Sequence, residues 1–393
     1  MMPSLMPTYA RADVAFERGD GAWLWDTEGR RYLDFAGGIA VTSLGHCHPH
    51  LVQALTDQAK KLWHTSNLYR IPGGERLADR LVAATFADTV FFSNSGAEAW
   101  EGGVKLIRKY FSAIGQPKRW RIITVQGAFH GRTLAGIAAA KTPKLVEGFG
   151  PMVEGFDQVP FGNLNELRAA ITDETAALHV EPIQGEGGIR KADLDYLRAL
   201  REICDEFGLL LYLDEIQCGY GRTGRFFAHE WAGIAPDVMC VAKGIGSGFP
   251  LGAFMATEKA AQGMTAGSHG STYGGNPLAM AVGNAVLDVL LAPGFLDTVR
   301  AVSGRLWEGL EHLARRHPQT IRQVRGAGLM VGLQVGPPAG DFIARMREHG
   351  MLGAPAADNV VRLLPPLVIG DEEIAVATET LEQVCRSFEV AHA

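Results

Sequence analysis

Short apolar runs alternate with longer amphipathic stretches through most of the chain. Six of these runs have the length and composition of buried strands, and they cover residues 89–93, 121–125, 176–180, 209–213, 238–242 and 251–256. Helical patterns lie between many of them. Over residues 193–207, for example, large apolar side chains recur every three or four positions, and Gly208 ends the pattern. This alternation predicts an α/β fold with a mostly parallel central sheet.

A long apolar helix is predicted to begin at Pro277, because proline is tolerated at the first helical position. The pattern of apolar and polar residues changes after this helix. Beyond this helix come an amphipathic helix, strand-like runs at residues 328–335 and 360–364, and a final helix. We interpret these later elements, together with the N-terminal segment, as a second and smaller α/β domain. The predicted domains are a large one, residues 46–292, and a small one, residues 1–45 and 293–393.

Composition excludes several classes of protein. With 47% hydrophobic residues among 393, the chain can bury a large core. A formal charge of −6 and scattered basic residues offer no stripe for a phosphate backbone, so no nucleic-acid partner is expected. Apolar runs fall far short of the ~20 residues that cross a bilayer, and the N-terminus shows no secretory pattern. We expect a cytoplasmic protein, and its five widely spaced cysteines suit free thiols.

Asp214 and Lys243 each follow or end a predicted buried strand, at the edge where open α/β sheets place their ligands. An aldehyde cofactor bound by a lysine as a Schiff base, with a carboxylate against its pyridine nitrogen, requires this pair of residues. The carboxylate keeps the nitrogen protonated, and the lysine later moves a proton between the substrate and the cofactor. For an isolated Asp and Lys, a buried ion pair is the alternative.

A candidate phosphate site lies in residues 94–98 (NSGAE), between a predicted strand and a helix. Free N–H groups at the helix start, the Ser95 hydroxyl and the small Gly96 would form an anion cradle. The same residues also suit a simple helix cap, in which Ser95 and Glu98 form a capping box.

Two further candidates follow the strand at residues 121–125. Phe129 can stack on a pyridine ring, and Arg132 offers a forked cation to a substrate carboxylate. A core aromatic beside a surface arginine is the alternative for such a pair.

Two other patterns are discounted. Residues 219–224 (GYGRTG) match the dinucleotide-binding motif, but no clear helix follows them. Residues 46–50 (HCHPH) resemble metal ligands, yet adjacent side chains cannot easily face one ion, and Pro49 suits a helix start with His48 as its cap. No metal site is predicted.

Taken in order, the motifs resemble those of the class III aminotransferases, which are fold-type-I enzymes dependent on pyridoxal 5′-phosphate (PLP). The resemblance covers nearly the whole chain and rests on residues 94–99 (NSGAEA), 129–133 (FHGRT), 181–188 (EPIQGEGG), 214–217 (DEIQ), 221–224 (GRTG), 242–244 (AKG) and 269–277 (HGSTYGGNP). It implies a fold-type-I PLP-dependent transferase, with a large domain around a mostly parallel sheet and a smaller α/β domain from both chain ends. PLP is the expected cofactor.

The resemblance also implies the role of each residue. Lys243 would carry the Schiff base and Asp214 would face the pyridine nitrogen as the catalytic pair. The remaining cofactor contacts would be Ser95, Gly96 and Ala97 at the phosphate, Phe129 on the ring, Gln217 at the ring hydroxyl, and Thr272 at the phosphate of the neighbouring subunit. A site completed across subunits implies a homodimer at minimum.

Within the family, residues 5–9 (LMPTY), 35–41 (FAGGIAV) and 359–366 (NVVRLLPP) resemble members that transfer the terminal amino group of N2-acetylornithine to 2-oxoglutarate in arginine biosynthesis. Acetylornithine carries its carboxylate far from the reacting amine, whereas glutamate has one beside it. The resemblance implies that Arg132 binds the distant carboxylate and Arg362 the near one, and that Glu186 neutralises Arg362 when no near carboxylate is present. Ser271 would also contact the substrate.

Several alternatives stay open. Succinylornithine, ornithine and 4-aminobutyrate enzymes share most of these motifs, although the glycines in residues 35–39 should leave room for an acylated amine. An aminomutase or a decarboxylase would use Lys243 and Asp214 equally, but the pairing of Glu186 with Arg362 favours transamination. A PLP-binding regulator would carry an additional DNA-binding region. The sequence gives no reason for Trp100 or for Gly102 and Gly103.

Overall fold

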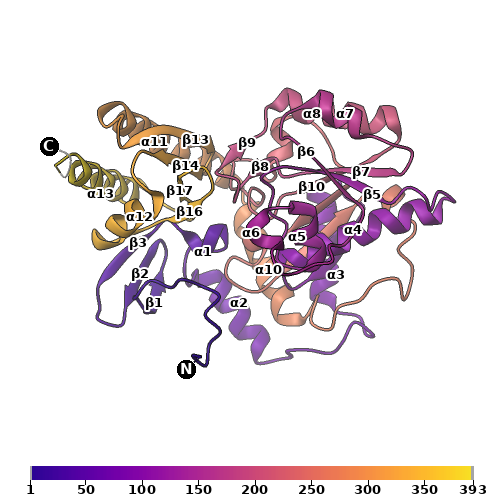
Figure 1. Ribbon diagram of the computed structural model, residues 1–393. Helices are drawn as coiled ribbons and strands as arrows, with labels where there is room; N and C mark the ends of the chain where they lie inside the picture. Colours follow the sequence, from indigo (N-terminus) through magenta and orange to yellow (C-terminus); the bar gives the residue numbers. More distant parts are fainter. Residues whose placement is uncertain (1, 391–393) are drawn as a thin grey trace.

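A seven-stranded sheet forms the centre of the computed structural model, which describes residues 2–390 (Figure 1). Its strands are β4 (Thr89–Ser93), β5 (Arg121–Val125), β6 (Phe156–Val159), β7 (Thr175–Val180), β10 (Leu210–Asp214), β11 (Val238–Val241) and β12 (Gly252–Ala256). They lie in the order β4-β12-β11-β10-β7-β5-β6, and all run parallel except β12. The predicted α/β class and mostly parallel sheet are confirmed.

The six apolar runs correspond to six of these strands, to within one residue at each end. The seventh strand, β6, was not predicted; it is an edge strand whose middle residues, Asp157 and Gln158, are polar. There Asp157 forms an ion pair with Arg121 of β5 at 2.5 Å. Strand β12 runs antiparallel because only residues 242–251 connect it to β11, whereas a parallel crossover needs a dozen residues or more.

Helices cover both faces of the sheet. The helices are α1 (Gly37–Ala40), α2 (Pro49–Ala59), α3 (Pro72–Ala84), α4 (Gly96–Ala113), α5 (Leu134–Ala140), α6 (Pro143–Val146), α7 (Leu164–Ala170), α8 (Leu194–Phe207), α9 (Glu258–Ala261), α10 (Pro277–Leu290), α11 (Phe295–Arg316), α12 (Ala339–Glu348) and α13 (Asp371–Val390). Along β10, Leu211 and Leu213 belong to the same buried cluster as α8, whereas Tyr212 belongs to the cluster formed with α4. The alternation of side chains along a strand thus supplies two cores.

The ends of α8 and α10 follow from their sequences. The side chain of Asp193 accepts the N–H of Asp195 at 2.8 Å, and Gly208 ends α8 in the left-handed conformation with φ 62°. Asn276 caps α10 by accepting the Ala279 N–H at 3.0 Å. No single described helix is long and apolar enough to cross a membrane; α10 and α11 together meet that test of length and composition but are bent by 71°.

The glycines of α4 let the helix lie directly on the sheet. A Cβ on Gly102 would lie 2.2 Å from the ring of Phe254, and one on Gly103 would lie 2.4 Å from the hydroxyl oxygen of Tyr212. Any side chain would therefore push the helix away, which outweighs the poor helix propensity of glycine. The close approach also buries Trp100 completely.

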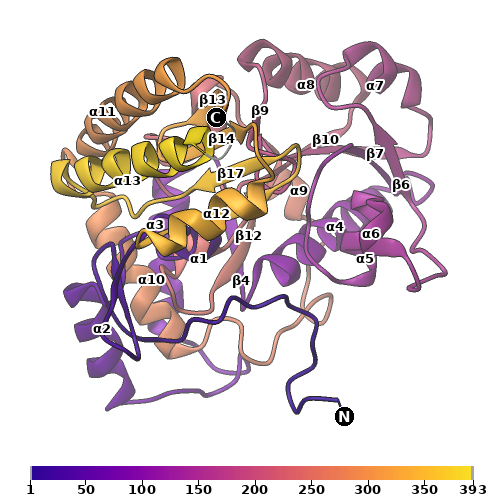
Figure 2. The same cartoon turned by 60° about the vertical axis from the view of Figure 1, so that its left-hand side comes forward.

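Smaller sheets lie beside this core (Figure 2). Strand β15 (Met351–Leu352) pairs in parallel with the last strand of an N-terminal series, β1 (Phe16–Asp20), β2 (Trp23–Asp26) and β3 (Arg31–Asp34). An antiparallel sheet contains β13 (Ile321–Ala327), β14 (Met330–Val335), β17 (Val360–Leu363) and β16 (Ala354–Ala356), and β8 (Ile183–Gln184) pairs with β9 (Arg190–Lys191). Strands from the N-terminal segment and from the later part of the chain thus pair in one sheet, while the division into a large and a small domain stays a prediction.

Candidate active site

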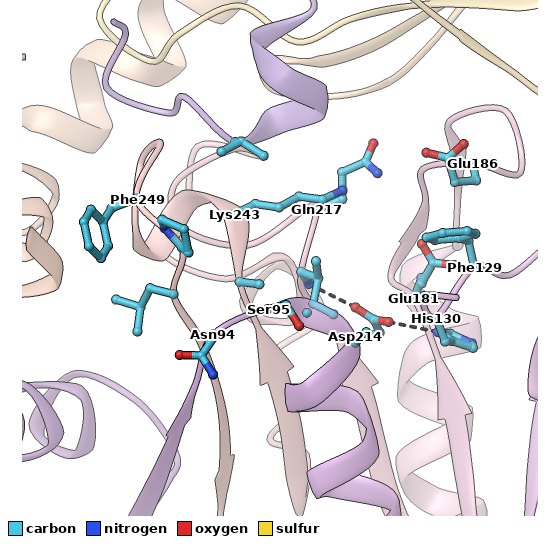
Figure 3. Close-up of a pocket in the computed structure, with 18 of the residues that line it drawn as sticks. Asn94, Ser95, Phe129, His130, Glu181, Glu186, Asp214, Gln217, Lys243 and Phe249 are labelled. Atoms are coloured by element: carbon cyan, nitrogen blue, oxygen red, sulfur yellow. Dashed lines mark hydrogen bonds and ion pairs between the residues drawn. The ribbon is translucent and has the colours of Figure 1, made fainter. Parts of the chain in front are cut away.

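A cavity of about 400 Å³ opens at the carboxyl ends of the central strands. Figure 3 shows Ser95, Asp214 and Lys243 around it, each from a different element. Eight of the predicted site residues line it, namely Ser95, Gly96, Ala97, Phe129, Glu186, Asp214, Gln217 and Lys243. The four others, Arg132, Ser271, Thr272 and Arg362, lie outside its lining. The sheet therefore brings together most of the candidates from distant parts of the chain.

Lys243 follows β11 and starts a short 3-10 helix, Lys243–Ile245. Its backbone is in the left-handed region with φ 51°, which costs a residue with a Cβ about 1–3 kcal/mol and is most common at functional sites. Burial lowers the pKa of its amine to about 8, and the nearby Arg362 acts in the same direction while Glu186 opposes it. A substantial fraction of the amine is then neutral near pH 8, as a nucleophilic lysine requires.

Asp214 is the last residue of β10 and is 3% exposed. One carboxylate oxygen, Oδ2, lies 2.9 Å from Nδ1 of His130, and the other accepts the Ile216 N–H at 3.1 Å. Two hydrogen bonds therefore hold the carboxylate in one orientation at the floor of the cavity, where it can face a cationic ring nitrogen.

The helix start at residues 94–98 fits a phosphate group. Ser95 is the N-cap of α4, and its Oγ accepts the Glu98 N–H at 3.2 Å. The Glu98 carboxylate accepts the backbone N–H of Asn94 instead of that of Ser95, so the predicted capping box is only half formed. Gly96 and Ala97 are in the first turn, whose N–H groups have no acceptor within the helix, and both line the cavity. The cap and the anion cradle thus coexist.

Glycines on two sides keep this cradle compact. A Cβ on Gly131 would lie 2.8 Å from the Cβ of Ala97, and one on Gly96 would lie 3.0 Å from the Ile216 side chain. The chain after Phe129 therefore passes directly over the start of α4.

Two buried residues, His130 and Glu181, belong to the site but were missed as candidates. The Glu181 carboxyl group accepts the N–H of Phe129 at 2.9 Å and that of Gly185 at 3.2 Å. Burial, followed by the negative charge of Asp214, raises the pKa of Glu181 to about 8. The signal that could have identified them was their position, because both occur within the motifs quoted above and come after predicted buried strands.

Arg362, on β17, lies behind the cavity lining and contacts two of the lining residues. Its Nη1 lies 2.6 Å from Oε1 of Glu186 and 3.3 Å from Oε1 of Gln217, while Nη2 donates to the Pro355 carbonyl at 2.7 Å. The Arg362 side chain is 1% exposed, and that of Glu186 is 35% exposed. A buried cation is therefore neutralised by a carboxylate that remains in contact with solvent and with the cavity.

The remaining predicted residues, Arg132, Ser271 and Thr272, lie outside the cavity lining. Arg132 is exposed, 5.9 Å from the centre of the Phe129 ring, and forms no ion pair with any residue in the described range. Ser271 Oγ accepts the Asn94 side-chain N–H at 3.3 Å, so it lies beside the helix start. Thr272 is exposed, and its contact with a neighbouring subunit stays a prediction.

The glycines of residues 35–39 have a structural reason that the sequence did not reveal. Gly37 has φ 54°, and a Cβ there would lie 2.6 Å from the carbonyl oxygen of Leu364. Close packing of two backbone segments therefore requires this glycine, whether or not it also leaves room for substrate. Val41, further along the same segment, lines the cavity.

The two discounted patterns have other roles. Arg222 of the GYGRTG segment is buried and donates to the carbonyl of Leu329 at 3.3 Å, in the turn between β13 and β14. His46 pairs with Asp34 at 2.8 Å and His50 with Asp288 at 2.9 Å, so the two histidines are directed to different carboxylates.

This chain is similar to known aminotransferases. The Aminotransferase class-III family matches residues 6–385. An acetylornithine aminotransferase from Agrobacterium fabrum is 59% identical over 98% of this chain and 96% of that protein. The crystal structure of N-acetylornithine aminotransferase from Stenotrophomonas maltophilia K279a has a TM-score of 0.85 and 38% identity, over 98% of each chain. Ornithine aminotransferase from Toxoplasma gondii, with PLP at partial occupancy in its active site, has a TM-score of 0.94 and 32% identity, over 99% of this chain and 93% of that chain.

Proposed function

The chain belongs to the class III aminotransferases and is a PLP-dependent transaminase, and we propose that it transfers the terminal amino group of N2-acetylornithine to 2-oxoglutarate. The products would be N-acetylglutamate 5-semialdehyde and glutamate, in arginine biosynthesis and in the cytoplasm. The activity of the Agrobacterium fabrum relative supports this choice of substrate.

The residues of the cavity fit PLP. The unpaired N–H groups of Gly96 and Ala97, with Ser95 beside them, suit the phosphate, and the amine of Lys243 suits the aldehyde. We assign Asp214 to the ring nitrogen, Phe129 to the ring face, Gln217 to the ring hydroxyl and Thr272 to the partner subunit's phosphate. When bound, PLP supplies an electron sink and a temporary carrier for the amino group.

Lys243 then acts as the group that moves the proton. Because burial lowers the pKa of its amine to about 8, the amine can take up a proton and release it again near neutral pH. Asp214, held in one orientation by His130 and by the Ile216 N–H, would place its carboxylate against the ring nitrogen.

The observation that carries the proposed substrates is the ion pair between Arg362 and Glu186 at 2.6 Å. With this pair closed, Arg362 is neutralised, and the site accepts a substrate that has no carboxylate beside its reacting amine. Because Glu186 is partly exposed, it can turn away and leave Arg362 free for the near carboxylate of glutamate. Arg132, which has no carboxylate partner of its own among the described residues, is free to bind the distant carboxylate.

We further propose a homodimer. Near Thr272, the side chains of Tyr273, Trp63, Leu68 and Tyr69 are 62% to 86% exposed, a gathering of apolar surface that usually marks an interface. The side chain of Asn67 links this region to residues 271–274 by donating hydrogen bonds to the carbonyls of Ser271 and Gly274. Sedimentation of the holoenzyme would give a monomer mass if this proposal is wrong.

Steady-state rates with 2-oxoglutarate as acceptor test the substrate. We expect kcat/KM to be highest for acetylornithine among acetylornithine, succinylornithine, ornithine and 4-aminobutyrate. A clear preference for 4-aminobutyrate would overturn the proposal. Glutamate should form in step with consumption of the donor, whereas a decarboxylase or an aminomutase would consume the donor without forming it.

A further inference from the structure

Trp100 is buried beneath the floor of the cavity, in the first turns of α4. Its indole Nε1 donates to Nε2 of His179 at 2.7 Å. The indole ring also lies parallel to the ring of His130, with centroids 5.3 Å apart and planes 7° apart. His130 in turn contacts Asp214, so Trp100 is two residues away from the proposed partner of the ring nitrogen.

The hydrogen bonds of His179 fix its tautomer. An indole N–H can only donate, so Nε2 of His179 must accept and carries no proton. Nδ1 lies 3.0 Å from the carbonyl oxygen of Tyr212, which can only accept, so Nδ1 carries the proton. Burial lowers the pKa of His179 well below its usual value, in agreement with a neutral ring.

The tautomer of His179 decides where the proton of His130 points. Nδ1 of His130 lies 2.9 Å from Oδ2 of Asp214 and 3.3 Å from Nε2 of His179. Both atoms are acceptors and compete for one N–H. The indole N–H already occupies the single lone pair of His179 Nε2, so the competition is settled in favour of Asp214.

We propose that Trp100 is a positioning residue, which blocks the lone pair of His179 and thereby directs the His130 N–H to Asp214. The inference rests on the proposed contact between Asp214 and the ring nitrogen of PLP. A hydrogen bond from His130 stabilises the ionised carboxylate, so the proton stays on the ring nitrogen and the electron sink stays strong.

His130, His179 and Asp214 also have the spacing of a metal site, since ligand atoms of these three side chains lie within 4.8 Å of one another. The hydrogen-bond assignment argues against it. Trp100 occupies the only free lone pair of His179, and a cation there would have to displace that bond.

Trp100→Phe tests the inference because it keeps an aromatic ring over His130 and removes the N–H. We expect kcat of the holoenzyme to fall about five- to tenfold in both half-reactions, with KM nearly unchanged, because one charge-assisted hydrogen bond is weakened. Part of the absorbance of bound PLP should move to shorter wavelength as the ring nitrogen loses its proton. The matched control is Trp307→Phe, which removes an indole hydrogen bond to the Gly328 carbonyl at 2.8 Å, outside the cavity lining. Equal spectra and equal kcat for the two variants would overturn the inference.

A second variant separates competition from simple loss of packing. His179→Phe removes the competing lone pair, so alone it should keep kcat near that of the native enzyme, and in the Trp100→Phe background it should restore part of the lost kcat. A double variant slower than Trp100→Phe would overturn the inference. Asp214→Asn should abolish most activity; if it does not, the proposed role of Asp214 fails, which is a different result from equal behaviour of the two tryptophan variants.

Discussion

Replacing Glu186 by glutamine should change the preference between the two substrates of the enzyme. In the native site Glu186 neutralises Arg362 across 2.6 Å, and glutamate must displace it before its near carboxylate can bind. Glu186→Gln keeps the size of the side chain and removes the charge. The glutamate half-reaction should therefore gain relative to the acetylornithine half-reaction, which loses the group that neutralises Arg362.

The size of the effect follows from the exposure of the pair. Two unit charges about 4 Å apart attract by about 4 kcal/mol at an effective dielectric constant of ~20. Because the Glu186 side chain is 35% exposed, water screens the attraction, and we expect a net contribution of about 1–2 kcal/mol. Since about 1.4 kcal/mol corresponds to a factor of ten, the ratio of kcat/KM for glutamate to that for acetylornithine should rise about tenfold.

Single-turnover absorbance of the holoenzyme with each amino donor measures the two half-reactions separately. The charge of Glu186 also raises the pKa of Lys243, so its removal alters the lysine as well. That change affects both half-reactions alike and cancels in the ratio. Arg362→Ala should shift the ratio in the opposite direction.

A matched control is Glu206→Gln, which breaks an exposed ion pair with Arg168 at 2.8 Å, at a distance from the cavity lining. It should leave the ratio unchanged. If Glu186→Gln changes both half-reactions by the same factor, to within about twofold of measurement scatter, the reasoning on the Arg362 pair is refuted.

Three further predictions concern the lysine and the helix. Lys243→Ala should bind PLP without the covalent link and lose nearly all transamination, measured by absorbance and by glutamate formation; an unchanged rate would remove Lys243 from the mechanism. The folded-state pKa of Lys243 is about 8, against 10.5 for an ordinary lysine, so the unfolded chain binds more protons between these two pH values. The free energy of unfolding of the cofactor-free enzyme should therefore rise by about 3 kcal/mol from pH 8 to above 10.5. Urea unfolding measures this rise, and Lys243→Met should lack it; an identical rise in that variant would refute the assignment. Gly103→Ala should cost about 2 kcal/mol in urea unfolding because its Cβ meets Tyr212, whereas Gly304→Ala, with open space around it in α11, should be neutral or stabilising; equal effects would contradict the packing argument.

The central strands were predictable because burial on both faces leaves a continuous apolar signal in the sequence. Strand β6 escaped because it lies at the edge of the sheet, where its two middle residues, Asp157 and Gln158, are polar and partly exposed. The first N-terminal strand escaped for a similar reason: β1 is almost entirely exposed and reads Phe-Glu-Arg-Gly-Asp. The direction of β12 could have been predicted, because the short connection between the expected strands at residues 238–242 and 251–256 leaves no room for a parallel crossover.

Asp214 and Lys243 could be placed from the sequence because parallel strands present their carboxyl ends along one edge. The ion pair of Glu186 with Arg362 could not be derived in this way, because it joins β17 to a loop that is distant in sequence, and only the family resemblance suggested it. The resemblance could not explain Trp100 either. Its role depends on a histidine near the end of the buried strand β7, where an apolar side chain is the usual expectation.

The buried polar groups below the cavity are linked in a chain of contacts. Each group in the chain has only one hydrogen-bond arrangement that its neighbours leave open to it. Tyr212 contributes at both ends, since its hydroxyl donates to the Trp100 carbonyl at 2.9 Å and its own carbonyl accepts from His179. Gly103 permits that hydroxyl contact by leaving no Cβ above the ring. The close fit of α4 on the sheet and the orientation of Asp214 are therefore parts of one arrangement. If a methyl group on one of these glycines pushed the helix outward, the hydrogen bond between Trp100 and His179 would weaken. The unusual glycines of this helix therefore serve the chemistry of the cavity through packing.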